Sequence, residues 1–377
     1  MARQFLSTDT APWRDGFGNG IDGVKTVSSN ATYDGVKRSC SGTSGSTSLT
    51  LGSSGFTNGM PVLIHQTRGT GVGNWELNKV ASGGGTTSLT MAYTLQNTYT
   101  DSGDSQAQII ELKQYASVTV NSGITWSAPD WDGDTGGIIA FLCNGPVTVT
   151  GTINADAKGF RGGGESSGGG SNSGEGTEGP SSDDPAIFGP AIGNGAGTAG
   201  NDEGYVPVNG GITGGGVGAG GNQEGTPTHG GEDAGNPALT NMVLGGGGSS
   251  GENSDDAVGG DGGGIVMIFA PSLTVTGSIT ADGGAGGNAT GGQDNGGGGG
   301  GGGCILLKGH LLTLGSSLVT ATGGAGGTGD DTGGAGGNGR IHADYLYTVT
   351  GTTTPTIDTD QENALLDKGS SFLFNSI

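Results

Sequence analysis

Lysine and arginine are missing from a long internal stretch of this chain, between Gly162 and Leu307, although the stretch contains 16 acidic residues. The whole chain has 13 basic and 35 acidic residues, which gives a formal net charge of −22. A surface of this sign repels the phosphates of nucleic acids and the head groups of anionic membranes. The charge therefore argues against nucleic-acid binding. Two interpretations of the acidic surface remain: it is simply solvated, or it binds divalent cations or a basic partner.

Long apolar runs, aromatic residues and cysteines are also scarce. The chain has no run of about 20 apolar residues, so no membrane span is expected. Hydrophobic residues make up 31% and aromatic residues 5%, too few for two or three conventional cores. Cys40, Cys143 and Cys304 form no CxxC pair, which argues against a zinc site or a disulfide framework. The first residues lack the apolar core of a secretory signal peptide.

Glycine is the residue in excess, with 90 of 377 residues, and 66 of these lie between residues 151 and 340. The strict third-position repeat of collagen is absent. Glycine in a helix interior costs about 1 kcal/mol relative to alanine, so a helix-rich enzyme is not expected.

Internal repeats organise the second half of the chain. Residues 137–156 align without a gap with residues 263–282, at an offset of 126, and both stretches end in Ala-Asp. Each copy is expected to form two short strands. The first is a continuous apolar run, which predicts a strand covered on both faces, and the second alternates Val-Thr-Val-Thr, which predicts one face on a core. Two further copies begin at Gly303 and at Gly339, and the first of these has one extra residue near Gly315. A partial copy begins upstream at Val118, offset by 29 from Val147.

The glycines concentrate in inserts between these copies, at residues 159–262, 283–303 and 323–339. One interpretation is disorder, because low hydrophobicity and high net charge are typical of disordered segments. The other is ordered polyglycine II, in which three-residue-per-turn helices pack side by side through backbone hydrogen bonds. We expect order, because most inserts begin and end at a repeat and because lysine is absent from them.

The sequence thus predicts an all-β protein with almost no α-helix. Residues 1–112 carry short strands with frequent turn signals and most of the basic residues, and are expected to form a small β-barrel or sandwich that docks to other proteins. Residues 113–357 are expected to form repeated strand rungs, a β-solenoid or sandwich, with a polyglycine II layer. Residues 358–377 are expected to form a C-terminal tail.

The strand pairs and glycine-rich inserts resemble the glycine-rich modules of phage and bacterial surface proteins, notably the tail-fibre adhesins of T-even-like phages. The resemblance rests on residues 117–164 and 262–287, where V-T-V-x-G-x-I is followed by Ala-Asp and glycine blocks. It implies a polyglycine II sandwich whose distal loops contact a host receptor. The regular two-strand rungs and the N-terminal region have no counterpart in that pattern.

Two sets of residues are candidates for binding. Asp130, Asp132 and Asp134 place three carboxylates at alternate positions, as calcium loops do, although Thr135 stands where such a loop needs glycine; a solvated turn is the alternative. Among aromatic residues of the large insert, three are candidate receptor contacts because aromatic side chains anchor interfaces: Phe160, Phe188 and Tyr205. No catalytic constellation is found, and no cofactor is expected apart from the calcium candidate.

We therefore expect a non-enzymatic structural protein of a virion or cell surface, which displays a glycine-rich module to a host receptor, glycan receptors included. Residues 1–112 would contact other virion or surface proteins, and a homo-oligomer is compatible with this role. Two alternatives remain open. One is a purely structural fibre or capsid-decoration protein, and the other is a carbohydrate-active β-helix enzyme with paired carboxylates on adjacent rungs.

Overall fold

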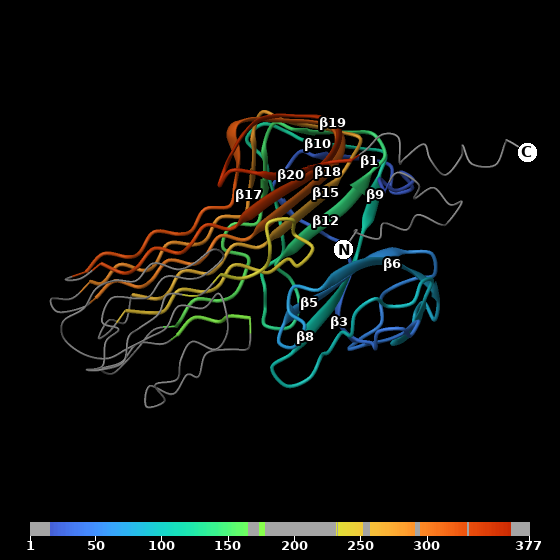
Figure 1. The fold of residues 1–377 in the computed structure, drawn as a ribbon, viewed down its shortest axis with the longest axis horizontal. Coiled ribbons are helices and arrows are strands. Elements are labelled where there is room, and N and C mark those ends of the chain that lie inside the picture. The colour runs from blue at the N-terminus through green and yellow to red at the C-terminus, as the bar shows by residue number, and fades with distance from the viewer. Residues whose placement is uncertain are drawn as a thin grey trace, which may run out of the picture.

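The computed structural model describes residues 16–164, 173–177, 231, 233–251, 257–290, 295–329 and 332–362. Within these ranges the chain forms twenty strands and no helix, so the expected all-β class is confirmed. In the same ranges, no helix long and apolar enough to cross a membrane is found. The strands form one closed barrel and one large parallel sheet (Figure 1).

Six antiparallel strands close the barrel in the order β3-β4-β7-β6-β5-β8. Alternating side chains of the short strands point into a core of their own, which contains Leu49, Leu89 and Ile109. Gly83 and Gly85 turn the chain at φ values of +84°, a backbone conformation that other residues rarely adopt. The small barrel expected near the N-terminus is thus present. Its strands are β3 (Lys37–Ser41), β4 (Ser48–Leu51), β5 (Pro61–Arg68), β6 (Trp75–Ser82), β7 (Ser88–Met91) and β8 (Gln106–Glu111).

The large sheet is parallel because successive copies of the repeat pair with one another in sequence order. Each copy contributes three strands, one more than expected, since a glycine turn divides the second half of the repeat into two. The short strands are β12 (Ile138–Cys143), β13 (Pro146–Val149), β14 (Thr152–Asn154), β15 (Ile265–Phe269), β16 (Ser272–Val275) and β17 (Ser278–Thr280). In two copies the three strands are continuous: β18 (Cys304–Thr320) pairs along its length with β15, β16 and β17, and β19 (Arg340–Thr354) pairs with β18.

Strand register tests the repeat alignment residue by residue. Val147 pairs with Leu273 at the expected offset of 126, but Ile138 pairs with Ile265, an offset of 127. The gapless alignment is therefore wrong in the first strand, because β12 has six residues where β15 has five, and the extra residue Cys143 lies between the paired positions of the first and second strands. The extra residue expected near Gly315 is confirmed, since the offset rises from 39 in β16 to 40 in β17. The upstream copy is confirmed as well, with Val118 opposite Val147.

The sheet also reaches beyond the boundaries expected for it. Strands β1 (Val24–Val27) and β2 (Ala31–Thr32) pair in parallel with β10 (Ser117–Val120) and β11 (Thr125–Ser127), so residues 24–32 belong to the sheet. The barrel is inserted between β2 and β9 (Lys113–Tyr115), which pairs with β12. At the other end β20 (Asp358–Gln361) pairs with β19, so the residues expected to begin a tail begin with a sheet strand.

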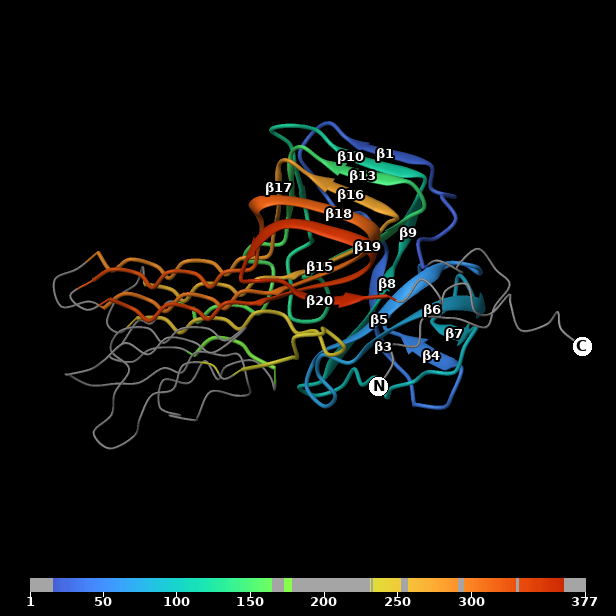
Figure 2. The ribbon, with the colours of Figure 1, turned by 45° about the horizontal axis from the view of Figure 1, so that its top comes forward.

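One hydrophobic cluster joins the sheet to the barrel. All six residues of β12 are buried, as its apolar run predicts, whereas in β13 only Val147 and Val149 are buried. At the centre of the cluster Phe141 contacts Trp126 and Tyr115, with ring centroids 5.2 and 5.9 Å apart. Leu63 and Ile110 of the barrel, with Leu112 directly after it, belong to the same cluster, so the barrel packs on the sheet through apolar side chains. Figure 2 shows the barrel beside the sheet.

Phe141→Ala tests this central packing. Phe141 is fully buried, so its truncation is expected to lower the free energy of unfolding by about 3–5 kcal/mol. Urea denaturation followed by tryptophan fluorescence measures the loss. Ile21→Ala is the control, since Ile21 is 76% exposed and should change stability by less than about 0.5 kcal/mol. Equal effects of the two substitutions would contradict the assignment of the core.

Candidate functional site

Glycine-rich segments leave the sheet after the third strand position and return to the first strand of the next copy. They run side by side away from the sheet (Figures 1 and 2). We call them the glycine lattice, and its described segments are residues 159–163, 173–177, 242–251, 257–263, 281–289, 295–303, 321–328 and 332–339.

Backbone hydrogen bonds join the segments with a period of three residues. Along residues 297–303, successive N–H groups donate in rotation to carbonyl groups of residues 281–287, 246–249 and 334–337, at 2.8–3.0 Å. Carbonyl groups of the same stretch accept from Gly260, Gly263, Gly324 and Gly327. This stretch thus bonds to five neighbouring segments. The period is that of an extended helix with three residues per turn.

Glycine is required here because the backbones lie too close for a side chain. A Cβ atom on Gly300 would lie 2.1 Å from the Asp261 carbonyl oxygen, and one on Gly299 would lie 2.1 Å from that of Gly324. Both distances are far shorter than any van der Waals contact, and the obstructing atoms are backbone. The glycine content is therefore a packing requirement of the lattice.

Aspartates at equivalent repeat positions fix the lattice where it leaves the sheet. The Asp156 carboxylate accepts the backbone N–H of Asp282 at 2.8 Å, and the Asp282 carboxylate accepts the backbone N–H and the hydroxyl of Thr322. Burial raises the pKa of Asp156. Asp156 and Asp282 occupy equivalent positions in two copies of the repeat. Their carboxylates therefore cap successive turns of backbone.

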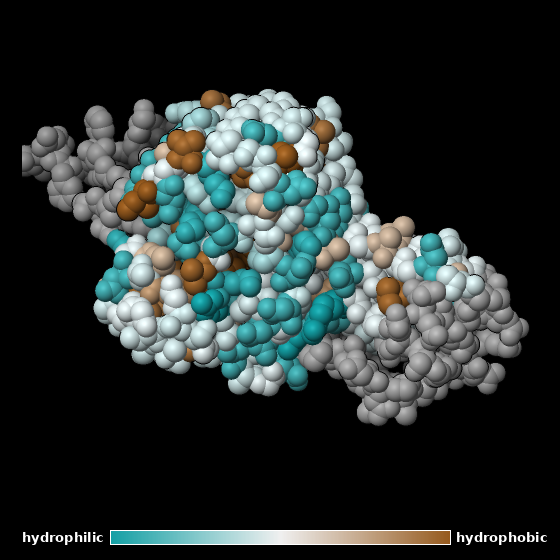
Figure 3. Space-filling model, turned by 180° about the vertical axis from the view of Figure 1, so that it is seen from behind, coloured by the Kyte–Doolittle hydropathy of each residue, from teal (hydrophilic) through white to brown (hydrophobic). Residues whose placement is uncertain are grey.

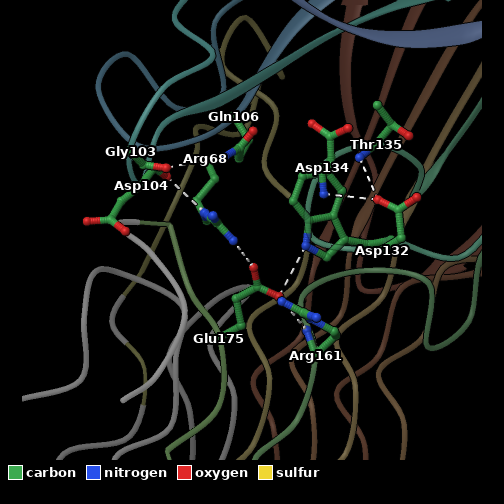
Figure 4. A network of polar contacts seen from close by, with 10 residues as sticks. Arg68, Gly103, Asp104, Gln106, Asp132, Asp134, Thr135, Arg161 and Glu175 are labelled. Atoms are coloured by element: carbon green, nitrogen blue, oxygen red, sulfur yellow. Dashed lines mark hydrogen bonds and ion pairs between the residues drawn. The ribbon is translucent and has the colours of Figure 1, made fainter. Parts of the chain in front are cut away.

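A buried carboxylate joins the lattice to the barrel (Figure 4). Glu175, with its side chain 3% exposed, pairs through Oε1 with Nη1 of Arg68 on β5. Its Oε2 accepts from Trp131 Nε1 at 3.1 Å and from Arg161 Nε at 3.0 Å. Arg68 in turn donates to the Asp104 carbonyl at 2.9 Å. We call these residues the Glu175 junction.

The backbone of Glu175 belongs to the lattice itself. Its N–H donates to the Arg161 carbonyl at 2.8 Å, and its carbonyl accepts from Gly247 at 3.0 Å. Both carboxylate oxygens are occupied by arginine and tryptophan donors, so the arrangement holds three parts of the chain together. Neither the sequence motifs nor the composition singled out Arg68 or Glu175, since the charge pair links positions 107 residues apart.

His65 makes a second connection between barrel and lattice. Its Nε2 contacts the Met242 carbonyl at 3.0 Å, and its Nδ1 contacts the Thr67 hydroxyl at 2.9 Å. Burial lowers the pKa of His65 to about 4, so the ring is neutral at pH 7. The contacts fit a neutral ring that donates from Nε2 to the carbonyl and accepts at Nδ1.

Two of the three aspartates considered for calcium have other partners. Asp132 Oδ1 accepts the backbone N–H groups of Asp134 and Thr135 at 2.9 and 2.7 Å, which makes a capped turn. Asp130 forms an ion pair with Lys158. Among the residues that the structure describes, Asp130, Asp132 and Asp134 do not form a group with ligand atoms within 4.8 Å of one another. The solvated turn, the alternative to a calcium loop, agrees with this geometry.

The candidate receptor contacts fall in different places. Phe160 is fully buried and packs edge-on against Trp131, with ring centroids 6.1 Å apart, so it supports the base of the lattice and presents no surface to a receptor. Phe188 and Tyr205 lie outside the described residues. No known protein family matches this chain, and no curated protein matches it either.

Glu175→Gln tests the junction. The substitution keeps the shape of the side chain but leaves Arg68 buried without a counter-charge, and is expected to cost about 3–5 kcal/mol of stability. Asp130→Asn is the matched control, because Asp130 is 78% exposed in its pair with Lys158 and should contribute about 0–1 kcal/mol. Urea denaturation of both variants provides the comparison. A loss no larger for Glu175→Gln than for the control would contradict a structural role of the junction.

Gly300→Ala tests the close approach of backbones. The added Cβ meets carbonyl oxygen on a neighbouring segment, so a loss of about 1–3 kcal/mol is expected, with faster proteolysis of the lattice. Gly164→Ala is the control, since a Cβ there meets nothing within 4 Å. It should leave stability unchanged or raise it by up to about 1 kcal/mol. If both variants resist protease equally, the lattice does not pack as described.

Proposed function

We propose that this chain is a non-enzymatic surface protein of a virion or cell, in which a β-solenoid carries a polyglycine II lattice that attaches to a host receptor. The observation that supports the proposal most strongly is the three-residue hydrogen-bond period of residues 297–303, with five neighbouring segments. A lattice of this kind is stiff in every lateral direction, because each segment is held by several others.

The energetics favour a role in display. Ordering each backbone residue costs about 1–2 kcal/mol, and glycine has no side chain whose burial could offset that cost. The hydrophobic cores of the sheet and the barrel consist mostly of their own residues, with only a few from the lattice, Phe160 among them. A large ordered glycine structure therefore adds little to the stability of the body, and its use is to project from it. This is the arrangement implied by the resemblance to tail-fibre adhesins.

The junctions favour transmission of force between the barrel and the lattice. Glu175 and His65 connect the barrel directly to lattice segments through buried contacts. A docking barrel joined in this way would hold the lattice in a fixed direction. We infer that the N-terminal region contacts other virion or surface proteins and that the opposite end of the lattice meets the receptor.

The surface chemistry limits the receptor. Scattered apolar residues, without a large apolar patch, mark the described part of the face in Figure 3. Large exposed hydrophobic residues of the described chain are few: Ile21, Val24, Val258, Leu311 and Tyr347. With a net charge of −22, a neutral glycan or a basic protein surface fits better than a polyanion.

Cell binding tests the proposal directly. The fluorescently labelled full chain is expected to bind saturably to at least one bacterial strain in a diverse panel. Gly300→Ala should weaken that binding by distorting the lattice, whereas Gly164→Ala should leave it unchanged. Absence of binding to every strain, with ordered self-assembly of the chain, would favour the purely structural fibre or decoration protein. Release of reducing ends from cell-surface polysaccharide would contradict the non-enzymatic assignment.

A further inference from the structure

Strands β19 and β20 bring one histidine and three aspartates together at the end of the sheet. The parallel register places His342 opposite Asp358 and Asp344 opposite Asp360. Residues two positions apart on a strand project from the same face. All four side chains therefore lie on one face, within two neighbouring strands.

The imidazole of His342 is the centre of this group. Its Nδ1 lies 2.8 Å from Asp358 Oδ2, while its Nε2 lies 3.2 Å from Asp344 Oδ1 and 3.9 Å from Asp360 Oδ2. The His342 side chain is fully buried and that of Asp344 is 7% exposed, whereas that of Asp360 is 71% exposed. One side of the group is thus enclosed by protein and the other is open to solvent.

The tautomer follows from these contacts. A neutral imidazole has one N–H and one lone pair. If Nδ1–H donates to Asp358, which is the shortest contact, the lone pair on Nε2 points toward the carboxylates of Asp344 and Asp360. The Nε2 lone pair and the carboxylate oxygens are all acceptors, so a cation is needed between them, either a proton on Nε2 or on a carboxyl oxygen, or a metal ion.

A proton and a metal ion would engage different numbers of these carboxylates. A proton on Nε2 can bond to Asp344 at 3.2 Å, but Asp360 at 3.9 Å is beyond hydrogen-bond reach. Ligands bound to zinc at about 2.0–2.2 Å in a tetrahedral arrangement are separated by about 3.4 Å. The two distances from Nε2 bracket that value, and all three ligand atoms lie within 4.8 Å of one another. We propose that His342, Asp344 and Asp360 form a binding site for a divalent transition-metal ion.

The surroundings of His342 suit this assignment. A metal-bound histidine usually donates its other ring N–H to a carboxylate, which fixes the ring and strengthens the ligand, and Asp358 occupies that position. One imidazole and two carboxylates match zinc or manganese, whereas calcium takes oxygen ligands alone. The solvent-exposed side of Asp360 provides the entry path and room for a bound water.

The charges of the neighbouring strands also favour a dication. Four carboxylates are close by, those of Asp344, Asp358, Asp360 and Glu362. On β18 the residue next to Asp344 in register is Lys308, whose ammonium pairs with Glu362. The other basic residue is Arg340, two residues before His342 on β19, which donates to the Ala234 carbonyl. Two basic residues against four carboxylates leave an excess of negative charge. A bound metal would connect β20 to β19, and would hold the last strand of the sheet in place.

Metal titration of the full chain tests the proposal. After dialysis against EDTA, isothermal titration with zinc chloride is expected to give one site per chain, and the melting temperature should rise with free zinc. Asp360→Asn should abolish this site, and Asp358→Asn should weaken it by about 10–100-fold. Asp130→Asn is the matched control, since it removes an exposed carboxylate elsewhere, and should bind as the unsubstituted chain does. Calcium chloride should give no such site.

A second measurement needs no variant. In ¹⁵N NMR spectra of the unsubstituted chain, zinc is expected to shift the His342 Nε2 resonance while Nδ1 remains protonated. If Nε2 carries a proton and does not respond to millimolar zinc, the group is an ion pair and the proposal is wrong. Weak binding that is identical in Asp360→Asn and Asp130→Asn would overturn it as well, because the acidic surface would then be the binder.

Discussion

The lateral hydrogen bond between glycine backbones is the interaction on which the glycine lattice, and the role proposed for it, depend. Each such bond requires two segments to approach more closely than any side chain permits, as the 2.1 Å separation calculated for a Cβ on Gly300 illustrates. A single hydrogen bond contributes only about 1 kcal/mol net, less than the entropy lost by ordering one glycine. The lattice is therefore stable only as a collective, with its segments aligned by something outside it.

The parallel sheet supplies that alignment. Six of the described lattice segments leave a strand or return to one, and apolar side chains fix the register of these strands. Asp156 and Asp282 cap two of the points of departure. The burial of apolar side chains in the sheet thus helps to order the glycine lattice, which has few apolar side chains of its own. The Glu175 junction fixes the lattice to the barrel in the same way. One of its two arginines, Arg68, comes from the barrel, and the other, Arg161, comes from the start of the lattice.

Sequence periodicity predicted the parts of the fold that repeat, and missed those defined by single contacts. Register of the second strand position follows the Val-Thr alternation from β10 onward, and the extra residue near Gly315 was predicted too, whereas the pairing of β12 with β15 departs from the alignment by one residue. The strands β1 and β2 were missed because a barrel separates them from their partners. Phe160 was expected to contact a receptor because it is an aromatic residue of the large insert, yet it is fully buried. The spacing His-x-Asp and Asp-x-Asp at His342 and Asp358 was a readable signal, but only the pairing of β19 with β20 brings these residues together.

Hydrogen exchange of the lattice amides tests the central claim most directly. Residues 297–303 have no conventional secondary structure, yet each of their N–H groups donates to a neighbouring segment. When the intact chain is exchanged at neutral pH and then digested for mass spectrometry, peptides covering these amides should exchange as slowly as peptides from β15 and β18. Exchange at the rate of an unstructured glycine peptide, with β15 and β18 still protected, would contradict the lattice while leaving the sheet intact.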